Sequence, residues 1–546
     1  MRSTLLAGPR RGHGGLRAAA AALTASAALL LAACGSGAAT GPGADAGPPT
    51  PGGTLRFAVS SDQGCLDPQQ VTSNDSVYSV RQLVDSLTDQ DPATGEIKPW
   101  LATTWTVSPD ATSYSFTLRP GVTFSDGTPL DANVVKANFD AVPKLGVRAS
   151  LAKGYLAGYT GTTVTGPDTF TVGFSSPNVQ FLQATSTHSL GILSAATVAK
   201  TDDERCASAI GSGPFTVGSY TKNQSTILVK RPGYAWGSSL FAHPGEAYLD
   251  KLEFRVVPES GVRTGSLQAN EVDAITSIGQ QDEAPLTAAG AQLLARANPG
   301  LPFQIAFNLS KPIVSDPAVR TALSLSINRP EVVSAIYTSQ TKPATSALAS
   351  STPDYTDQAG QLGFDLAKAQ QGLDAAGWTP GPDGIRVKDG QRLTIPVVYA
   401  NNLGSVKPTL ELLQQQAKAA GIDLQLLEKQ ISDVAALQQS GDFSALWFNL
   451  TRADPDILRS QYWSGGVNLL RFPPSPLDQL LTAQASAADP ATRTALVADA
   501  QRDLLAQHLV VPVVELTTVL AVAPTTHGVT FDASSRIQLH DAWKSQ

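Results

Sequence analysis

The side chains best suited to hold a small polar solute gather in residues 446–456 and just after them. Arg452 can grip a carboxylate or another anionic group through two parallel hydrogen bonds. Asp454 can hold an ammonium group, and indole rings can form aromatic walls. The candidate ligand-binding residues are therefore Trp447, Asn449, Arg452, Asp454 and Trp463. The alternatives are that the two tryptophans pack in a core, that the asparagine completes a strand end, and that the charged pair forms a solvated turn.

Catalytic chemistry has little support in the sequence. No Gly-x-Ser-x-Gly, His-Glu-x-x-His or Cys-x-x-Cys motif occurs, and Asp454 and Asp456 flank Pro455 at a spacing typical of a turn. Catalytic triads can be scattered in sequence, so a secreted hydrolase is kept as a remote alternative. We expect no catalytic residues, no cofactor and no metal site, because the histidines show no ligand spacing: His13, His188, His243, His508, His527 and His540.

The elements around the candidate block follow an α/β pattern. Residues 445–449 read as a strand, and a strand at 393–400, a helix at 407–420 and a strand at 422–427 form a predicted β-α-β unit. Such a unit indicates parallel strand pairing. A long helix at 489–508 precedes a further strand at 510–514.

A second pattern of alternating residues lies nearer the N-terminus. Apolar and polar residues alternate at 114–118 and again at 122–124, which predicts two strands of a hairpin around Pro120-Gly121. Gly121 can adopt the positive φ that such a turn often needs. Asp131 is then predicted to cap a helix that carries Val135 and Phe139 on its buried face.

Residues 1–33 have the features of a lipoprotein signal peptide. A basic front precedes an apolar run from Ala18 to Ala33, and Leu31-Ala-Ala-Cys34 resembles a lipobox, in which Cys34 receives a diacylglycerol and becomes the mature N-terminus. The alternative is an ordinary secretory signal that ends in cysteine. Residues 34–53 are almost entirely Gly, Ala, Ser, Thr and Pro, a composition typical of a disordered tether.

Charge and hydropathy restrict the partners. Removal of residues 1–33 takes four arginines, so the formal charge changes from −7 to 35 − 46 = −11, which disfavours nucleic-acid binding. No apolar run after Ala33 approaches the roughly 20 residues that a membrane span needs. The lipid on Cys34 would therefore be the membrane anchor.

Two further cysteines, Cys65 and Cys206, follow Cys34. In an oxidising compartment two cysteines favour one disulfide, which here would close a long loop. The alternative is two buried free thiols.

The region around the predicted hairpin resembles a known family. Its pattern is similar to the signature of family 5 extracellular solute-binding proteins, the oligopeptide and dipeptide receptors of ABC importers. Residues 52–55, 211–215 and 316–329 match further blocks of that family. The residues of the main block that carry the resemblance are Pro99, Leu101, Ala102, Trp105, Ser108, Asp110, Tyr114, Phe116, Leu118, Arg119, Val122, Phe124, Asp126, Gly127 and Pro129.

The resemblance implies a two-lobed α/β fold of the large peptide-receptor type. Lobe I would span residues 54–303, with an inserted subdomain at about 75–205, and residues 516–546 would return to it. Lobe II would span 304–515, joined through a two-strand hinge. Cys65 and Cys206 would both lie in lobe I.

The resemblance also implies a function. The mature chain would be a monomeric, lipid-anchored receptor at the outer face of the cell membrane or in the periplasm, which captures a peptide or peptide-like solute and delivers it to an ABC permease. The alternatives are a receptor for a siderophore, metal chelate or oligosaccharide, and a ligand-sensing protein.

One position departs from the family pattern. In the peptide receptors an acid three positions before the Asp-Pro pair holds the ligand's α-ammonium group, and that position is Thr451 here. A buried ammonium without a partner is costly. We therefore expect a modified or blocked peptide, a siderophore or another amide-rich solute, with Asp454 as the nearest substitute acid.

Overall fold

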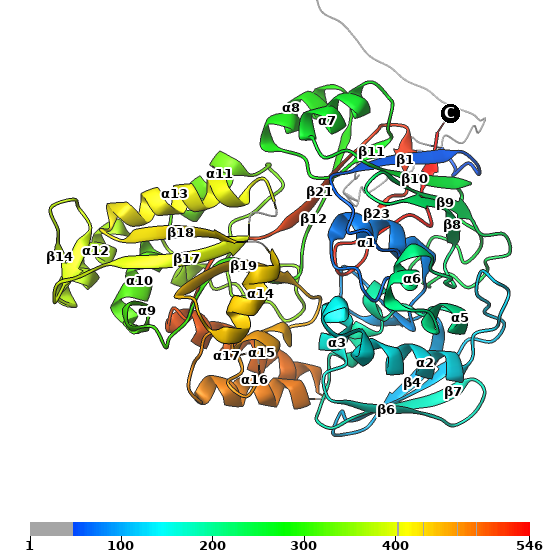
Figure 1. Cartoon of the computed structure of the whole chain (residues 1–546), viewed down its shortest axis with the longest axis horizontal. Helices are drawn as coiled ribbons and strands as arrows, with labels where there is room; N and C mark the ends of the chain where they lie inside the picture. Colours follow the sequence, from blue (N-terminus) through cyan, green and yellow to red (C-terminus); the bar gives the residue numbers. More distant parts are fainter. Residues whose placement is uncertain (1–46, 401–402, 430, 467, 488, 546) are drawn as a thin grey trace, which may run out of the picture. The chain divides into compact units, whose positions relative to one another are not determined.

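The computed structural model describes residues 47–400, 403–429, 431–466, 468–487 and 489–545 (Figure 1). The predicted signal peptide, Cys34 and the first part of the tether lie outside the described residues. Along the part of the chain that is described, no helix has the length and apolar character that crossing a membrane requires.

Lobe I is built on a seven-stranded sheet whose neighbours are distant in sequence. β1 runs parallel to β10 and β11, whereas the other pairs are antiparallel. Because β21 comes from near the end of the chain, the C-terminal segment is part of this sheet. In sheet order the strands are β12 (Gln292–Ala297), β21 (Thr517–Val522), β11 (Ala274–Ile275), β1 (Thr54–Val59), β10 (Lys251–Val256), β9 (Ser225–Lys230) and β8 (Phe215–Thr221).

A second, four-stranded antiparallel sheet lies inside the region expected to be an inserted subdomain. Asp131 caps the helix that follows β5, since its carboxylate accepts a hydrogen bond from Val134 N at 2.9 Å, and Val135 and Phe139 are buried, as predicted. In order, the strands are β4 (Ala102–Val107), β5 (Ser113–Leu118), β7 (Thr169–Phe174) and β6 (Tyr159–Val164), with helices α2 (Ala132–Ala141), α3 (Ser150–Tyr155) and α4 (Phe181–Ala184).

The predicted hairpin around Pro120-Gly121 is wrong. β5 pairs with β4 on one edge and with β7 on the other, so no edge is left for residues 122–124. Those residues fold back instead, and Leu130 N donates to Val122 O at 3.0 Å. Val122 and Phe124 are still buried in the same core as β5. Apolar alternation identified the buried side chains without specifying their strand partner.

Shorter elements complete lobe I and its C-terminal segment. The helices are α1 (Asn74–Val80), α5 (Ala195–Val198), α6 (Asp202–Ala207), α7 (Ser260–Gln268) and α8 (Gln280–Ala288). Three two-stranded ribbons pair β2 (Thr88–Gln90) with β3 (Ile97–Pro99), β22 (Thr526–His527) with β25 (Trp543–Lys544), and β23 (Thr530–Phe531) with β24 (Ile537–Gln538).

Lobe II is built on a five-stranded sheet that is covered on both faces. Val397 and Val398 are adjacent on one strand, yet they belong to the two different cores of the lobe. β17 and β18 pair in parallel around a helix, which confirms the predicted β-α-β unit. In order, the strands are β18 (Asp423–Lys429), β17 (Thr394–Ala400), β19 (Ala445–Thr451), β13 (Gly300–Phe307) and β20 (Val510–Val514).

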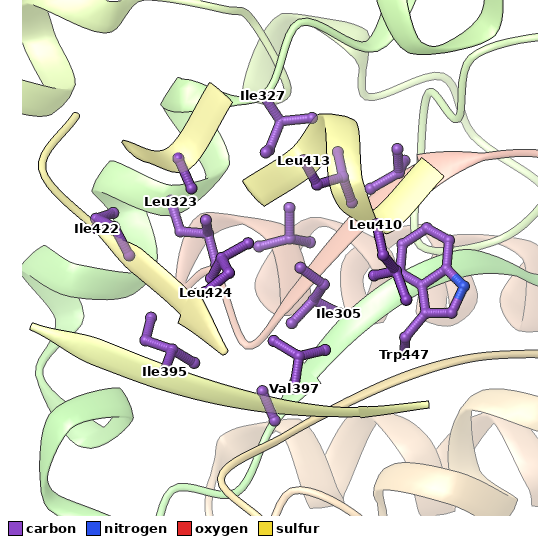
Figure 2. Close-up of a cluster of buried hydrophobic side chains, with 14 of the residues drawn as sticks. Ile305, Leu323, Ile327, Ile395, Val397, Leu410, Leu413, Ile422, Leu424 and Trp447 are labelled. Atoms are coloured by element: carbon purple, nitrogen blue, oxygen red, sulfur yellow. The ribbon is translucent and has the colours of Figure 1, made fainter. Parts of the chain in front are cut away.

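Figure 2 shows the first of these cores, where Leu323, Leu410 and Leu413 meet Ile305 and the other inward side chains of the sheet. The sheet is therefore a fully buried central layer. The helices over this core are α9 (Pro312–Ser315), α10 (Pro317–Ser326), α11 (Arg329–Ile336), α12 (Leu366–Ala375) and α13 (Val406–Ala419). Those over the opposite core are α14 (Ile431–Ser440), α15 (Ile457–Tyr462), α16 (Pro476–Ser486) and α17 (Pro490–Ala506).

The chain passes between the lobes at two adjacent points. β12 ends at Ala297 in the lobe I sheet, and β13 begins at Gly300 in the lobe II sheet, three residues before the boundary expected at Phe303. The return runs from Val514 to Thr517. Asn298 joins the two crossings, because its N–H donates to Leu516 O at 2.7 Å and its amide oxygen accepts from the Thr518 hydroxyl at 2.8 Å.

The last residues of the expected tether are held against lobe I. The Thr50 hydroxyl donates to Lys544 O at 2.7 Å, and Gly52 N donates to Tyr248 O at 2.8 Å. The folded body therefore begins a few residues before the expected limit at Gly53.

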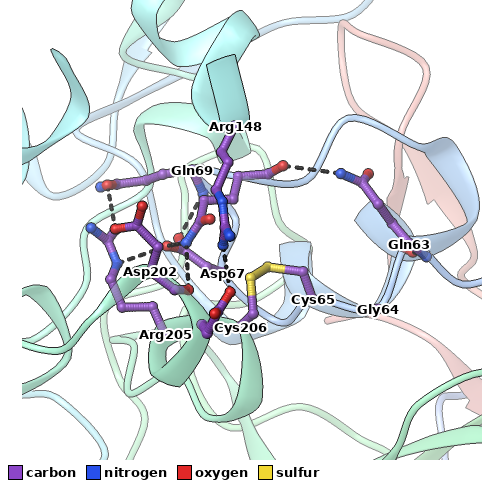
Figure 3. The surroundings of a disulfide bond; sticks show 12 residues. Gln63, Gly64, Cys65, Asp67, Gln69, Arg148, Asp202, Arg205 and Cys206 are labelled. Atoms are coloured by element: carbon purple, nitrogen blue, oxygen red, sulfur yellow. Dashed lines mark hydrogen bonds and ion pairs between the residues drawn. A yellow bond between two sulfur atoms is a disulfide. The ribbon is translucent and has the colours of Figure 1, made fainter. Parts of the chain in front are cut away.

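The structure contains the expected disulfide between Cys65 and Cys206, within lobe I (Figure 3). Leu66 N donates to Cys206 O at 2.8 Å, so backbone pairing accompanies the covalent link. The buried ion pair of Arg205 with Asp67, at 2.7 Å, lies beside it. The disulfide joins the segment after β1 to the helix α6.

Loss of this disulfide should destabilise lobe I. The bond closes a loop of 141 residues, for which the chain-entropy model gives about 5 kcal/mol. We expect the double variant Cys65→Ser/Cys206→Ser to unfold at a clearly lower urea concentration than the oxidised wild type. The reduced wild type serves as the control and should match the double variant. Equal midpoints for the oxidised and reduced wild type would contradict the expectation.

Candidate ligand site between the lobes

Arg452 extends from lobe II to lobe I. It follows β19, and its backbone N donates to Pro299 O at 2.9 Å. Its Nη1 lies 3.3 Å from the Gln180 amide oxygen, and its guanidinium carbon lies 4.7 Å from the centre of the Tyr155 ring. Only 5% of the residue is exposed. Arg452 is therefore a buried contact between the lobes and not part of a solvated turn.

The helices α3 and α4 form the lobe I side of this contact. A Cβ atom at Gly154 would stand 3.1 Å from Arg452 Nη2, so the absence of a side chain there leaves room for the guanidinium. Asn178 positions this segment, since its amide nitrogen donates to Tyr155 O at 3.1 Å.

Several buried polar atoms near this contact have no hydrogen-bond partner among the described residues. They are Arg452 Nε, Asn178 Oδ1 and both amide atoms of Gln183. Gln183 is only 4% exposed. A buried polar atom without a partner costs roughly 1–3 kcal/mol, so such a group needs an explanation. A polar solute held between the lobes would supply the partners.

A second buried arginine comes from the C-terminal segment. Arg536 lies between β23 and β24, is 5% exposed, and its Nε and one terminal nitrogen, Nη1, have no hydrogen-bond partner in the described part of the chain. Burial raises the pKa of Tyr155, and the guanidinium groups of Arg452 and Arg536 oppose that rise. Burial, with smaller contributions from Arg536 and Arg81, lowers the pKa of His188 to about 3.

The predicted acid Asp454 is already paired. Arg493 of α17 binds its carboxylate through two bonds of 3.0 and 2.6 Å. Asp456 is paired in the same way with Arg459, with both distances 2.7 Å. Asp456 N also donates to Asp454 Oδ1, so the two acids shape a turn. A ligand ammonium would have to compete with a guanidinium for Asp454.

The two predicted tryptophans pack within lobe II. Trp447 is 3% exposed and stacks on Phe303, with ring centres 5.3 Å apart and planes 8° apart, and Figure 2 shows it in the core. Trp463 is partly buried against the second core of the lobe. Asn449 is partly exposed on β19. Thr451, which stands where the family pattern has an acid, accepts a hydrogen bond from the side-chain amide of Asn298 at 3.3 Å. Asn298 lies where the chain crosses from lobe I to lobe II.

A small cavity is lined by Ala453, the residue that follows Arg452 in sequence. Its volume is about 160 Å³, below the roughly 300 Å³ of a typical small-molecule site. Both lobes line it, through residues 90–95, Arg296 and Ala533 on one side and residues 350–353 and Ala453 on the other. The sequence does not identify the residues that line this cavity, nor Tyr155, Gln183 and Arg536, because no motif marks them.

Comparison with known families decides the class of protein. The model of "Bacterial extracellular solute-binding proteins, family 5 Middle" matches residues 96–468. The chain belongs to this family. Among its relatives, the nickel-binding periplasmic protein of Escherichia coli K12 is 27% identical over 395 residues, covering 70% of this chain and 72% of that one. The glutathione-binding protein GsiB of the same strain is 26% identical over 464 residues, covering 81% and 85%.

Solved structures of solute-binding proteins have the same fold. NikA from Brucella suis in complex with Fe(III)-EDTA superimposes with a TM-score of 0.79 at 23% identity, over 90% of this chain and 100% of that one. The oligopeptide-binding protein AppA from Bacillus subtilis in complex with a nonapeptide gives 0.73 at 19% identity, over 91% and 100%. The predicted two-lobed α/β fold is confirmed. The relatives named here are solute-binding proteins rather than enzymes.

The Asp454–Arg493 pair should be a structural element of lobe II. The two side chains are 6% and 15% exposed, and removing one partner of a buried ion pair leaves the other charge uncompensated, at a cost of about 3–5 kcal/mol. We expect Asp454→Asn to lower the urea midpoint strongly. The control is Asp499→Asn, which breaks the exposed Asp499–Arg502 pair on the same helix and should change little. Similar midpoints for the two variants would contradict the assignment.

The free energy of unfolding should decrease at acid pH, partly because of His188. Its pKa is lowered to about 3 in the folded state, whereas the unfolded side chain has a pKa near 6.5. The unfolded state therefore binds more protons between these values, and stability decreases as pH falls below about 6.5, by up to about 1.4 kcal/mol per pH unit. We expect His188→Gln to flatten this part of the pH–stability curve measured by urea unfolding. An unchanged slope would contradict the expectation.

Proposed function

We propose that this family 5 protein is the extracytoplasmic receptor of an ABC importer, which binds a peptide or peptide-like solute between its lobes and delivers it to the permease. The observation that carries the proposal is Arg452, a buried cation of lobe II whose neighbours Gln180 and Tyr155 belong to lobe I. A ligand that binds it contacts both lobes at once. No catalytic step is part of this function.

The crossings at 298–299 and 515–516 would act as the hinge. A solute favours the closed state only through contacts that it makes there and not in the open state. Arg452 provides such a contact, because its lobe I neighbours would separate from it on opening. The protein would act as a monomer.

The solute is proposed to be modified, blocked or otherwise unlike an ordinary peptide. Thr451 is neutral and Asp454 is bound to Arg493, so the candidate block offers no free carboxylate for an α-ammonium group. A peptide whose α-amine is blocked, or is bonded within the solute itself, would not have to bury an ammonium group without a partner. A metal chelate or siderophore is the second candidate, since Brucella suis NikA was solved with Fe(III)-EDTA and chelate carboxylates suit an arginine.

Arg452 should be required for binding. We expect native mass spectrometry of the purified protein to detect a co-purifying solute, and calorimetry with that solute to show about a 10- to 100-fold loss of affinity in Arg452→Ala, as for a charged hydrogen bond. Arg502→Ala, which removes an exposed arginine of α17, is the control and should bind normally. Full affinity in Arg452→Ala, or scattering curves unchanged by the bound solute, would refute the proposed closure.

Cys34 is proposed to carry the lipid that anchors the receptor, at the outer face of the cell membrane or in the periplasm. Its support is the Leu-Ala-Ala-Cys order after an apolar run with a basic front. We expect Cys34→Ser to shift the protein out of the detergent phase or to leave it unprocessed. Unchanged partitioning between detergent and water would exclude the anchor.

A further inference from the structure

Two histidines and an aspartate from distant segments meet in lobe I. His243 lies in the loop before β10, and His540 and Asp541 lie between β24 and β25 in the C-terminal segment. These side chains offer one ligand atom each, and the three atoms lie within 4.8 Å of one another. Because the cluster joins segments that are 295 positions apart at Gly245 and His540, no local spacing of the histidines predicts it. None of the three residues belongs to the candidate ligand site between the lobes.

The hydrogen bonds of His540 determine which of its ring nitrogens carries a proton. Nε2 lies 2.7 Å from Gly245 O, and a carbonyl oxygen only accepts, so Nε2 must carry a hydrogen. Nδ1 lies 2.8 Å from Asp541 Oδ1. In the neutral ring Nδ1 therefore presents its lone pair to a carboxylate oxygen, and two such atoms repel unless they share a proton or a metal cation.

A second proton on His540 would satisfy Nδ1 and the carboxylate of Asp541, but it would leave His243 unexplained. His243 Nδ1 is a buried atom that lies 3.6 Å from Asp541 Oδ1 and has no hydrogen-bond partner in the described part of the chain. That distance is too long for a hydrogen bond, and a buried polar atom without a partner is costly. One divalent cation would serve both imidazole nitrogens and the carboxylate at once.

The surrounding contacts hold these groups in place. A metal-bound histidine commonly donates its other ring N–H to a backbone carbonyl, and His540 makes this contact with Gly245 O. Asp541 Oδ2 accepts from Ala242 N at 2.8 Å, while Oδ1 is the oxygen near the two histidines. The His540 ring is 1% exposed and stacks on Phe241 with ring centres 4.5 Å apart. The ring is therefore fixed by packing and by hydrogen bonds.

We propose that His243, His540 and Asp541 bind a transition-metal ion such as Zn²⁺, through both Nδ1 atoms and Asp541 Oδ1, with water completing the shell. Two imidazoles and one carboxylate suit Zn²⁺ and similar metals, whereas Ca²⁺ and Mg²⁺ prefer oxygen ligands alone. A tetrahedral ion with bonds of about 2.0–2.2 Å holds its ligand atoms roughly 3.3 Å apart. The observed distances of 2.8 and 3.6 Å lie on either side of that value. The side chains of His243 and Asp541 are 25% and 18% exposed, so an ion can reach them from solvent.

The ion would fasten the end of the chain to lobe I. The C-terminal segment supplies β21 to the lobe I sheet and then runs through β24 to His540 and Asp541. A metal bound there joins this segment to the loop before β10. An ion that binds only the folded state also stabilises it. This role is independent of any solute between the lobes, so the proposed receptor function neither requires the metal site nor fails with it.

The test uses the mature chain without a histidine tag, in a Cys34→Ser background that removes the thiol outside the disulfide. After metal is stripped with EDTA and the EDTA is removed, we expect Zn²⁺ to bind, measured by competition with a chromophoric chelator, and to raise the Tm. His243→Phe keeps a ring against Tyr248 but removes the ligand nitrogen. It should weaken Zn²⁺ binding at least about tenfold, since loss of an outer partner alone costs about 10- to 100-fold. Asp541→Asn, which can still accept from Ala242 N, should do the same and serves as a second variant.

His527→Phe is the matched control. His527 belongs to the same C-terminal segment and packs its ring on Trp543, but it lies outside the cluster, so this variant should bind Zn²⁺ like the parent protein. Ca²⁺ and Mg²⁺ should not raise the Tm comparably.

Three results would overturn the proposal. If the parent protein does not bind Zn²⁺, the cluster is an ion pair in which His540 carries the second proton. If His243→Phe and Asp541→Asn bind Zn²⁺ as tightly as the parent, the ion lies elsewhere. Equal stabilisation by Ca²⁺ would exclude a site selective for transition metals. None of these results bears on the receptor function, which is judged by the co-purifying solute and by scattering.

Discussion

Two adjacent backbone crossings constrain the rest of this structure. The chain builds most of lobe I, enters lobe II at Gly300, and returns at Thr517 to the sheet that it left. Asn298 bonds to Leu516 and Thr518 across the two crossings and so fixes the lobes at one edge. Residues that are far apart in sequence, such as Asn298, Thr451 and Leu516, therefore meet where the chain crosses between the lobes.

The charged residues near the end of β19 differ in whether they have a partner of opposite charge. Asp454 and Asp456 follow Arg452 closely in sequence, yet both acids are neutralised by arginines of their own lobe. The Asp454–Arg493 pair joins α17 to the segment after β19, and the Asp456–Arg459 pair lies at the start of α15, so neither acid is left for Arg452. The neutral Thr451 adds none. Arg452 is thus a buried cation just after a strand, and it takes part in neither ion pair. A guanidinium group in such a position is suited to recognise an anionic group.

The hydrophobic cores of lobe II hold the strand before Arg452 in place. Trp447 packs on Phe303 inside lobe II, so β19, the strand that ends just before Arg452, is anchored by an aromatic pair and by cores on both faces of its sheet. In lobe I, the disulfide joins α6 to the segment after β1. Polar groups fixed in place by packed cores lose little freedom when a small solute binds, which favours selective binding.

The sequence by itself determined the local structure and the family. Alternation, helical spacing and caps such as Asp131 predicted the β-α-β unit of lobe II and the helix α2, because these signals depend on residues within a few positions of one another. It also singled out Arg452, and the two cysteines after Cys34 suggested the disulfide.

Tertiary structure decided which groups meet. It paired residues 122–124 with residues 128–130 and not with β5, placed Trp447 in a core, and paired Asp454 with an arginine 39 positions away. No local pattern encodes these outcomes. Sheet partners and charge partners are chosen by packing between segments distant in the chain, so periodicity can show that a side chain is buried but not what it is buried against.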